Sequence, residues 1–143
     1  MRNKNFFKNK TILITGHTGF KGSWMTLVLK SLGANVVGYA LNPISKPNFF
    51  DNLKLTKFLK KDYRNNILDR KKLDHVIKKH KPSIVFHMAA QSSVLVSYKS
   101  PIETIKANVL GTSNLLESCK NKKFIKWIVI VTTDKVYLNL NLN

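Results

Sequence analysis

The chain is poor in cysteine, arginine and acidic side chains, and it has no long apolar run. Its one cysteine, Cys119, excludes an internal disulfide framework, and without a CxxC or His/Cys cluster we expect no metal site. No apolar stretch approaches the roughly 20 residues that a membrane-spanning helix needs. The apolar part of the basic start at 1–8 is too short for a signal peptide. We therefore expect a soluble, cytoplasmic protein with no membrane partner.

The charge of the chain is strongly one-sided. The sequence has 25 Lys and Arg residues against 7 Asp and Glu, a formal net charge of +18. Such a balance suggests a nucleic-acid partner. The lysines are scattered without a dense block, however, and arginine, which binds phosphates and base edges better, is scarce. We expect no specific nucleic-acid partner, although a basic surface would help to capture an anionic nucleotide.

A glycine-rich segment follows the apolar run at 11–15. Its glycines, Gly16, Gly19 and Gly22, follow the pattern G-x-x-G-x-x-G, and helical periodicity begins behind them. A strand, a turn and a helix in this order present main-chain N–H groups at a helix N-terminus, where the partial positive charge favours a diphosphate. Gly16 allows the tight reversal, Gly19 the close approach of a phosphate, and Gly22 the contact between helix and strand. We predict a nucleotide site here, although the spacing differs from the G-x-G-x-x-G of dehydrogenases.

Apolar runs and amphipathic stretches alternate along the chain. Strands are expected at 11–15, 35–41, 61–67, 83–87 and 127–131, with helices between them. Asp69 is expected to cap a helix that ends at His80, and Ser100 and Glu103 to form a capping box. The alternation predicts an α/β fold, a doubly wound parallel sheet of Rossmann type in one domain over 1–143.

Helical periodicity assigns a core-facing side to each longer helix. These sides comprise Trp24, Leu27, Val28 and Leu32 in the first helix, Leu73, Val76 and Ile77 in the helix after Asp69, and Ile105, Val109, Leu116 and Cys119 in the last.

The end of the second strand bears on which dinucleotide binds. An acidic side chain usually stands there and binds the adenosine ribose, but this chain has Tyr39, Ala40 and Leu41. Lys46, in the next loop, could meet a 2′-phosphate instead. The residues alone leave NAD and NADP open.

Four segments resemble, in order and separation, the extended short-chain dehydrogenase/reductase superfamily, and within it the CDP-glucose 4,6-dehydratases. They read Thr-Gly-His-Thr-Gly-Phe-Lys-Gly-Ser-Trp at 15–24, His-Met-Ala-Ala-Gln at 87–91, Asn-Val-Leu-Gly-Thr at 108–112 and Thr-Thr-Asp-Lys-Val-Tyr at 132–137. The first and last are the specific ones, and relatives acting on dTDP-glucose or GDP-mannose usually carry Glu in place of Lys135. The resemblance covers nearly all of the chain and implies NAD as cofactor and a nucleotide sugar, CDP-glucose, as substrate.

The resemblance also implies roles for residues at the cofactor site. Asn66 stands where relatives have Asp beside the adenine, and an Asn can still bond the base edge. His87 is either a strand-end histidine with a satisfied ring, which we favour, or a catalytic one. Cofactor contacts are implied for Gly16, Thr18, Gly19, Phe20, Lys21, Gly22, Asn66, Ile67, Ala89, Ala90, Gln91 and Asn108.

Three catalytic residues are implied by resemblance after the fifth strand. Asp134 matches the acid that protonates the departing 6-hydroxyl, a task for a carboxyl still protonated near neutral pH. Thr133 would hydrogen-bond the 4-oxygen. Lys135 matches the position that removes the C5 proton or supports its removal, and a lysine must be neutral to act as a base. On residue types alone, 132–135 is a polar turn behind a buried strand.

Two features of the family are missing. Tyr137 is followed at the fourth position by Asn141, so the Tyr-x-x-x-Lys pair has no counterpart, and Leu95 and Val96 replace a common arginine. The sequence ends before the sugar-binding part, so we expect a truncation, a frameshift or a split gene. Three interpretations stay open. In the first, the chain is the NAD-binding half of a nucleotide-sugar dehydratase that works as a homodimer or with a complementing C-terminal fragment. In the second, it is a nucleotide-binding pseudoenzyme or a fragment of another nucleotide-sugar epimerase or dehydratase. In the third, it is a basic nucleic-acid-associated protein.

Overall fold

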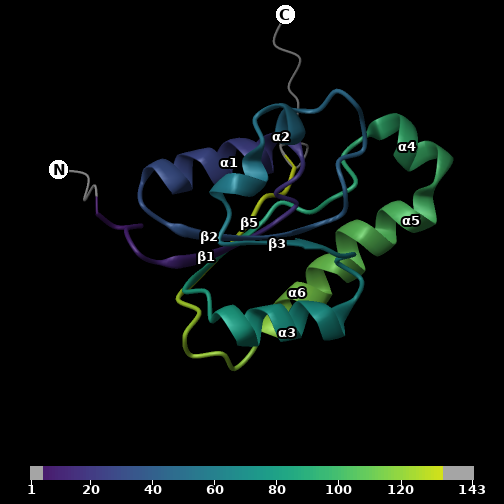
Figure 1. Ribbon diagram of the computed structural model, residues 1–143. Helices are drawn as coiled ribbons and strands as arrows, with labels where there is room; N and C mark the ends of the chain where they lie inside the picture. Colours follow the sequence, from purple (N-terminus) through teal and green to yellow (C-terminus); the bar gives the residue numbers. More distant parts are fainter. Residues whose placement is uncertain (1–4, 134–143) are drawn as a thin grey trace, which may run out of the picture.

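A computed structural model describes residues 5–133 of the chain (Figure 1). Five parallel strands form one sheet in the order β3-β2-β1-β4-β5. Their bounds are β1 Thr11–Thr15, β2 Asn35–Ala40, β3 Lys61–Arg64, β4 Ile84–His87 and β5 Trp127–Ile130. The strand order reverses direction at β1, which is the arrangement of a doubly wound sheet. The predicted fold class is confirmed.

Helices cover both faces of the sheet. Figure 1 shows α1 and α2 on one face and α3 and α6 on the other, while α4 and α5 extend beyond the sheet. The helical elements are α1 Phe20–Ser31, α2 Phe49–Asn52, η1 Leu55–Phe58, α3 Arg70–His80, α4 Val94–Lys99, α5 Pro101–Ile105, the π-helical turn η2 Lys106–Leu110, and α6 Gly111–Cys119. No helix among the described residues combines the length and apolarity needed to cross a membrane.

Two apolar clusters make up the core, one on each face of the sheet. Alternate residues of β1 enter different clusters: Ile12 and Ile14 face α1, whereas Leu13 faces α3 and α6. All three are at most 1% exposed. Burial of both faces explains why this strand is an unbroken apolar run without the alternation of a half-exposed strand.

The start of α3 follows the sequence prediction. The Asp69 carboxylate accepts a hydrogen bond from the Lys72 amide at 3.1 Å, and Leu73, Val76 and Ile77 are buried. The capping box at α5 is only partly present. Ser100 is the N-cap and Pro101 the first helical residue, but the Ser100 side chain makes no capping hydrogen bond.

The predicted core-facing side of α1 is wrong at two positions. Trp24 and Val28 are each 48% exposed, and the buried residues are Gly22, Ser23, Thr26 and Leu29. Small side chains bring the start of α1 close to the glycine turn, so the bulky stripe is rotated away from the sheet. Trp24 stacks on Phe49 of α2 with ring centroids 5.0 Å apart.

The predicted buried face of the last helix is also largely wrong. Ile105, Val109 and Leu116 are exposed, and only Cys119, at 5% exposed, is buried as expected. The turn η2 is π-helical. Such a turn holds more residues than an α-turn and shifts the phase of the helix. A single 3.6-residue period drawn across α5 and α6 therefore selects the wrong side chains, and Gly111, Leu115 and Ser118 face the sheet instead.

Candidate functional site

The glycine turn lies between β1 and α1, at the carboxyl edge of the sheet. Gly16 has a φ of +76°, and an added Cβ would lie 2.6 Å from the main chain of Met88 and Ala89. An added Cβ at Gly22 would overlap the Gly16 carbonyl oxygen. These two glycines are therefore required by the protein's own close packing, which agrees with the reversal and the helix contact predicted for them.

Gly19 differs from the other two glycines because, among residues 5–133, nothing occupies its open side. A Cβ there would meet one atom, the Gly16 oxygen at an ordinary 3.4 Å. Gly19 is the exposed N-cap of α1, and the first turn of this helix holds no acidic side chain. Since the first amides of a helix have no intrahelical acceptor, this is room for an anion beside donors that have no partner within the helix. The geometry can receive a diphosphate.

The three other predicted residues of the turn surround this space. The Thr18 hydroxyl donates to the Leu41 carbonyl at 3.0 Å and ties the turn to the end of β2. Phe20 is 67% exposed and leans on Phe49, and Lys21 is exposed. The turn is thus flanked by the long cationic side chain of Lys21 and the aromatic ring of Phe20, both exposed and available to a ligand.

His87, at the end of β4, has both ring nitrogens engaged. Its Nδ1 lies 2.6 Å from the Thr15 hydroxyl and its Nε2 lies 2.9 Å from the Thr112 hydroxyl. Thr112 donates its own hydrogen to the Asn108 carbonyl at 2.7 Å, so Nε2 donates to Thr112 and Nδ1 accepts from Thr15. Burial lowers the pKa of His87. The satisfied structural ring that we favoured is confirmed.

Behind β4 the chain runs through Ala89 and Ala90 to Gln91, which Asn108 holds. The Asn108 side chain accepts from the Gln91 amide at 2.7 Å and donates to the Gln91 carbonyl at 2.9 Å. Ala89 is half-buried and Ala90 exposed. Asn108 therefore supports this segment from η2, while contact of Asn108, Ala89, Ala90 and Gln91 with a cofactor stays a prediction.

On the adenine side of the expected site, the two predicted residues behave differently. Asn66 is exposed, and its side-chain oxygen accepts from the Leu68 amide at 2.9 Å. Ile67 is only 8% exposed and packs in the core, directly against Gly111. Only the main chain of Ile67 could face a ligand, so contact between these residues and an adenine stays a prediction.

The predicted catalytic residues lie at the limit of the structure. Thr133 follows β5 and is exposed, whereas Asp134 and Lys135 lie outside the described residues, as does Tyr137. Leu95 and Val96, in α4, are 75% and 45% exposed. The roles of Thr133, Asp134 and Lys135 therefore stay predictions.

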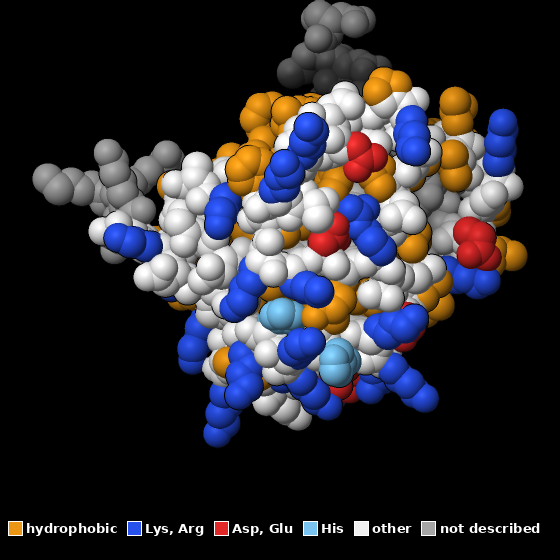
Figure 2. All heavy atoms as spheres, in the orientation of Figure 1, with side chains coloured by type: hydrophobic (Ala, Val, Ile, Leu, Met, Phe, Trp, Pro, Cys, Tyr) orange, Lys and Arg blue, Asp and Glu red, His pale blue; other side chains and the backbone are white. Residues whose placement is uncertain are grey.

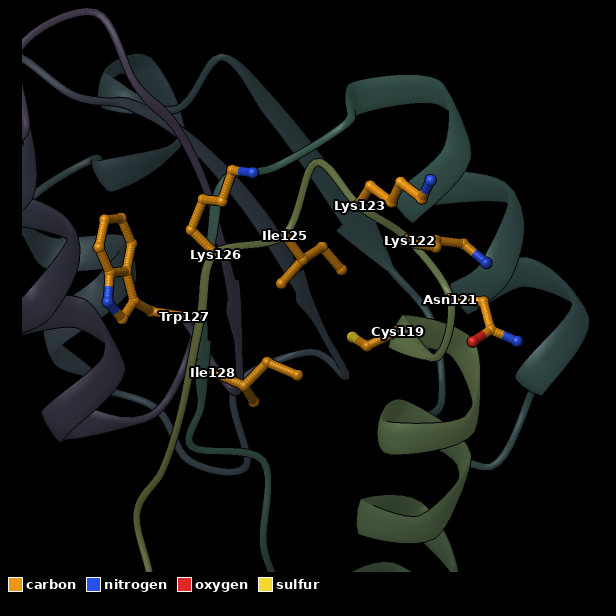
Figure 3. A pocket seen from close by; sticks show the side chains of 8 residues that line it. All are labelled: Cys119, Asn121, Lys122, Lys123, Ile125, Lys126, Trp127 and Ile128. Carbon is orange, nitrogen blue, oxygen red and sulfur yellow. The ribbon is translucent and has the colours of Figure 1, made fainter.

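A hollow of about 480 Å³ lies away from the glycine turn, between the end of α6 and β5 (Figure 3). Ile125, Ile128 and Cys119 line it together with lysines, and burial raises the pKa of the Cys119 thiol to about 11. A thiol with this pKa is a poor nucleophile near neutral pH. The hollow lies at the start of β5, away from the carboxyl edge that carries the glycine turn, and it brings no acid, base or nucleophile together.

The surface charge gives little focus for a nucleic acid on the visible face. In Figure 2 the Lys and Arg side chains are spread over the surface, with apolar side chains gathered near α1 and α2.

No group of three His, Cys, Asp or Glu side chains within residues 5–133 could hold a metal ion.

Comparison with known protein families shows which family the chain belongs to. Residues 13–140 match the family described as GDP-mannose 4,6 dehydratase. The chain belongs to this family. It is 48% identical over 139 residues to the CDP-glucose 4,6-dehydratase of Salmonella typhimurium, covering 97% of this chain and 38% of that protein.

Solved structures of similar fold agree with this family membership. The UDP-glucose 4-epimerase of Thermotoga maritima, solved with UDP-glucose, is 29% identical, with a TM-score of 0.74 over 86% of this chain and 38% of the epimerase. The UDP-glucose 4-epimerase of Bifidobacterium longum, solved with NAD+ and UDP, is 25% identical, with a TM-score of 0.77 over 89% of this chain and 38% of the other. The chain thus spans about two fifths of the length of these relatives.

Several site residues escaped the sequence analysis. His17, Asp62 and Arg64 form a part-buried hydrogen-bonded group beneath the glycine turn, and Thr15 and Thr112 bracket His87. One signal was present: Gly38 interrupts an apolar strand, and a glycine inside a strand often marks the close approach of another group.

Proposed function

We propose that this chain is the NAD-binding part of a nucleotide-sugar 4,6-dehydratase acting on CDP-glucose. The observation that carries the proposal is the glycine turn: two of its glycines are needed for packing, while Gly19 leaves open space beside the first amides of α1. The 48% identity to a CDP-glucose 4,6-dehydratase supports the substrate. Two UDP-glucose 4-epimerases of this fold, from Thermus thermophilus and Bifidobacterium longum, are 29% and 25% identical to the chain and were solved with NAD or NAD+. They support NAD as the cofactor.

The residues of the turn fit the pyrophosphate of a dinucleotide. Gly19 gives it room, the amides at the start of α1 donate to it, and Lys21 adds a positive charge near it. We assign Asn66 and the main chain of Ile67 to the adenine, and Ala89, Ala90 and Gln91, at the end of β4, to the nicotinamide half. NAD, when bound, would take up a hydride from the sugar and return it.

The chemistry at the sugar is assigned to the segment after β5. Thr133 would hydrogen-bond the 4-oxygen, Asp134 would protonate the departing 6-hydroxyl, and Lys135 would remove the C5 proton or support its removal. We place the protein in the cytoplasm, and we expect it to work as a homodimer or with a C-terminal partner that supplies Tyr-x-x-x-Lys.

A second candidate is a nucleotide-binding protein without turnover. It is favoured by one observation: the sequence given has no Tyr-x-x-x-Lys pair, and Tyr137, which lies in a different segment from the family's tyrosine, is followed at the fourth position by Asn141. Both candidates require NAD binding at the turn, and they differ in whether a sugar product forms.

Calorimetric titration with NAD tests the shared part. Gly19→Val should abolish detectable binding, because a branched side chain fills the open space at the turn. Gly19→Ala, whose Cβ lies at an ordinary contact distance, controls for folding of the turn. Ser113→Val, on the exposed side of α6, controls for adding a β-branched residue to a helix. Equal binding of NAD by the parent and Gly19→Val would exclude a cofactor site here.

A further inference from the structure

The ring of His17, inside the glycine turn, lies over β2. It is fully buried. A Cβ added to Gly38 would lie 2.5 Å from ring carbon Cδ2. The ring therefore occupies the space that a side chain of β2 would otherwise fill. The absence of that side chain at Gly38 is what lets the turn reach across the strand.

Beyond Gly38 the ring meets a carboxylate on β3. Gly38 and Asp62 are paired residues of neighbouring strands, and His17 Nε2 lies 2.8 Å from Asp62 Oδ1. A carboxylate only accepts hydrogen bonds, so Nε2 carries the hydrogen and donates. Nδ1 is buried and has no hydrogen-bond partner among the described residues. Among the described residues, the hydrogen bonding of the ring therefore runs through Nε2.

Two further side chains fix the carboxylate. Arg64 donates to both Asp62 oxygens, from Nε at 2.9 Å and from its terminal nitrogen at 2.8 Å. Burial by itself would raise the pKa of Asp62, but the hydrogen bonds from His17 and Arg64 lower it below its usual value. Phe50 closes the group, edge-on to the His17 ring at 5.4 Å and beneath the Arg64 guanidinium at 4.7 Å.

We propose that His17 and Asp62 are a positioning pair that holds the glycine turn in the shape that receives a pyrophosphate. The inference rests on the proposed NAD site. His17 stands between two glycines of the turn, and glycines permit many backbone conformations. Its carbonyl accepts from the Ser23 hydroxyl at 3.1 Å, and its side chain is held by Asp62. With main chain and side chain both tied, the turn is ordered before the ligand arrives, which favours binding.

A set of substitutions separates positioning from packing. The Gln side chain can place its amide nitrogen near the His17 Nε2 position, whereas Asn is too short and Leu has no donor. Gly38→Ala displaces the His17 ring while both residues of the pair keep their identity. Asp62→Asn removes the carboxylate charge of the pair and should weaken NAD binding, and Asp74→Asn, which removes a partly exposed carboxylate from α3, is its control for overall charge. Each variant is titrated with NAD, and with adenosine, which has no pyrophosphate.

We expect His17→Asn, His17→Leu and Gly38→Ala to weaken NAD binding by about tenfold or more, equivalent to about 1.4 kcal/mol. His17→Gln and Asp74→Asn should bind NAD as the parent does, and adenosine affinity should not change in any variant. If His17→Leu fails to fold, His17→Asn and Gly38→Ala carry the comparison. NAD affinities equal to that of the parent would overturn the proposal. So would equal weakening of NAD and adenosine, because that marks His17 as a packing residue.

Hydrogen exchange decides the same question without a ligand. The amides of Gly19 and Ser23 bond within the turn and the start of α1, so they report how well the turn is held. They should exchange faster in His17→Leu or His17→Asn than in His17→Gln. If the parent does not bind NAD, the proposed function fails, while this measurement still supports or overturns the pair. Equal exchange in all variants would show that the pair does not order the turn.

Discussion

The side chain of Asn108 pairs with the main chain of Gln91 through two hydrogen bonds, one accepted at 2.7 Å and one donated at 2.9 Å. Gln91 lies in the loop behind β4 and Asn108 in η2, so the pairing fixes the main chain of this loop. It joins the helical layer to the carboxyl edge of the sheet.

We expect Asn108→Leu to lower the free energy of unfolding by about 1–3 kcal/mol, because it leaves a part-buried amide and carbonyl of Gln91 without partners. Asn108→Asp retains the acceptor and should cost less. Urea unfolding measures both, with Ser113→Ala on exposed α6 as the control. An unchanged midpoint in Asn108→Leu would mean that water satisfies Gln91.

Burial of His87 predicts a dependence of stability on acidity. Its pKa is lowered in the folded protein, so below the ordinary value near 6.5 the unfolded chain binds more protons than the folded one. Stability is therefore complete above that value and falls as the pH drops through it. His80, whose pKa is lowered by burial and by neighbouring lysines, acts in the same direction.

Urea unfolding between pH 8 and pH 5 should show this loss, and His87→Gln should reduce its slope even if it also lowers stability overall. His80→Gln, which removes the more exposed of the two rings, measures the other contribution. A slope in His87→Gln identical to that of the parent would mean that His87 does not titrate differently on folding.

The 143-residue polypeptide alone should show no turnover of CDP-glucose with NAD. The family's Tyr-x-x-x-Lys pair is missing from its sequence, so general base and substrate positioning are lost together. An absorbance assay for the 4-keto-6-deoxy product tests this, with Asp134→Asn as the blank. Product above that blank would contradict the expectation.

Strand β5 makes the same polypeptide prone to self-association. Within residues 5–133 it pairs on one side only, with β4, and Trp127, Ile128 and Val129 are 49%, 37% and 42% exposed. An apolar strand edge of this kind is a template for pairing with another chain. The net charge of +18 opposes association at low salt, and salt above about 0.1 M screens it.

Light scattering should therefore show association that grows with salt. Val129→Lys should reduce it, and Leu95→Lys, which adds the same charge on α4, should reduce it much less. A monomer at every ionic strength would show that the edge is protected.

Local patterns account for what the sequence could predict. The five strands, the glycine turn and the cap at Asp69 each depend on residues close together in the chain. The outward faces of α1 and α6 could not be predicted by period alone, because small residues at Gly22 and Ser23 and a π-turn at 106–110 set the rotation.

The supporting contacts of the site escaped prediction for a different reason. Thr15 and His87 are 72 positions apart, and His17 and Asp62 are 45 apart. No local pattern links such residues, and only the parallel arrangement of β1, β2, β3 and β4 brings them together.

The chain's one cysteine can report on the packing between α6 and the sheet. The Cys119 sulfur points into the space between α6 and β5 (Figure 3), it is 5% exposed, and burial raises its pKa to about 11. A thiol that is nearly buried and protonated at neutral pH reacts slowly with a thiol reagent that enters the hollow, so its labelling rate should rise when the packing of α6 on the sheet loosens. The protein thus carries its own single-site probe of how tightly this layer is packed, with no residue to remove or introduce.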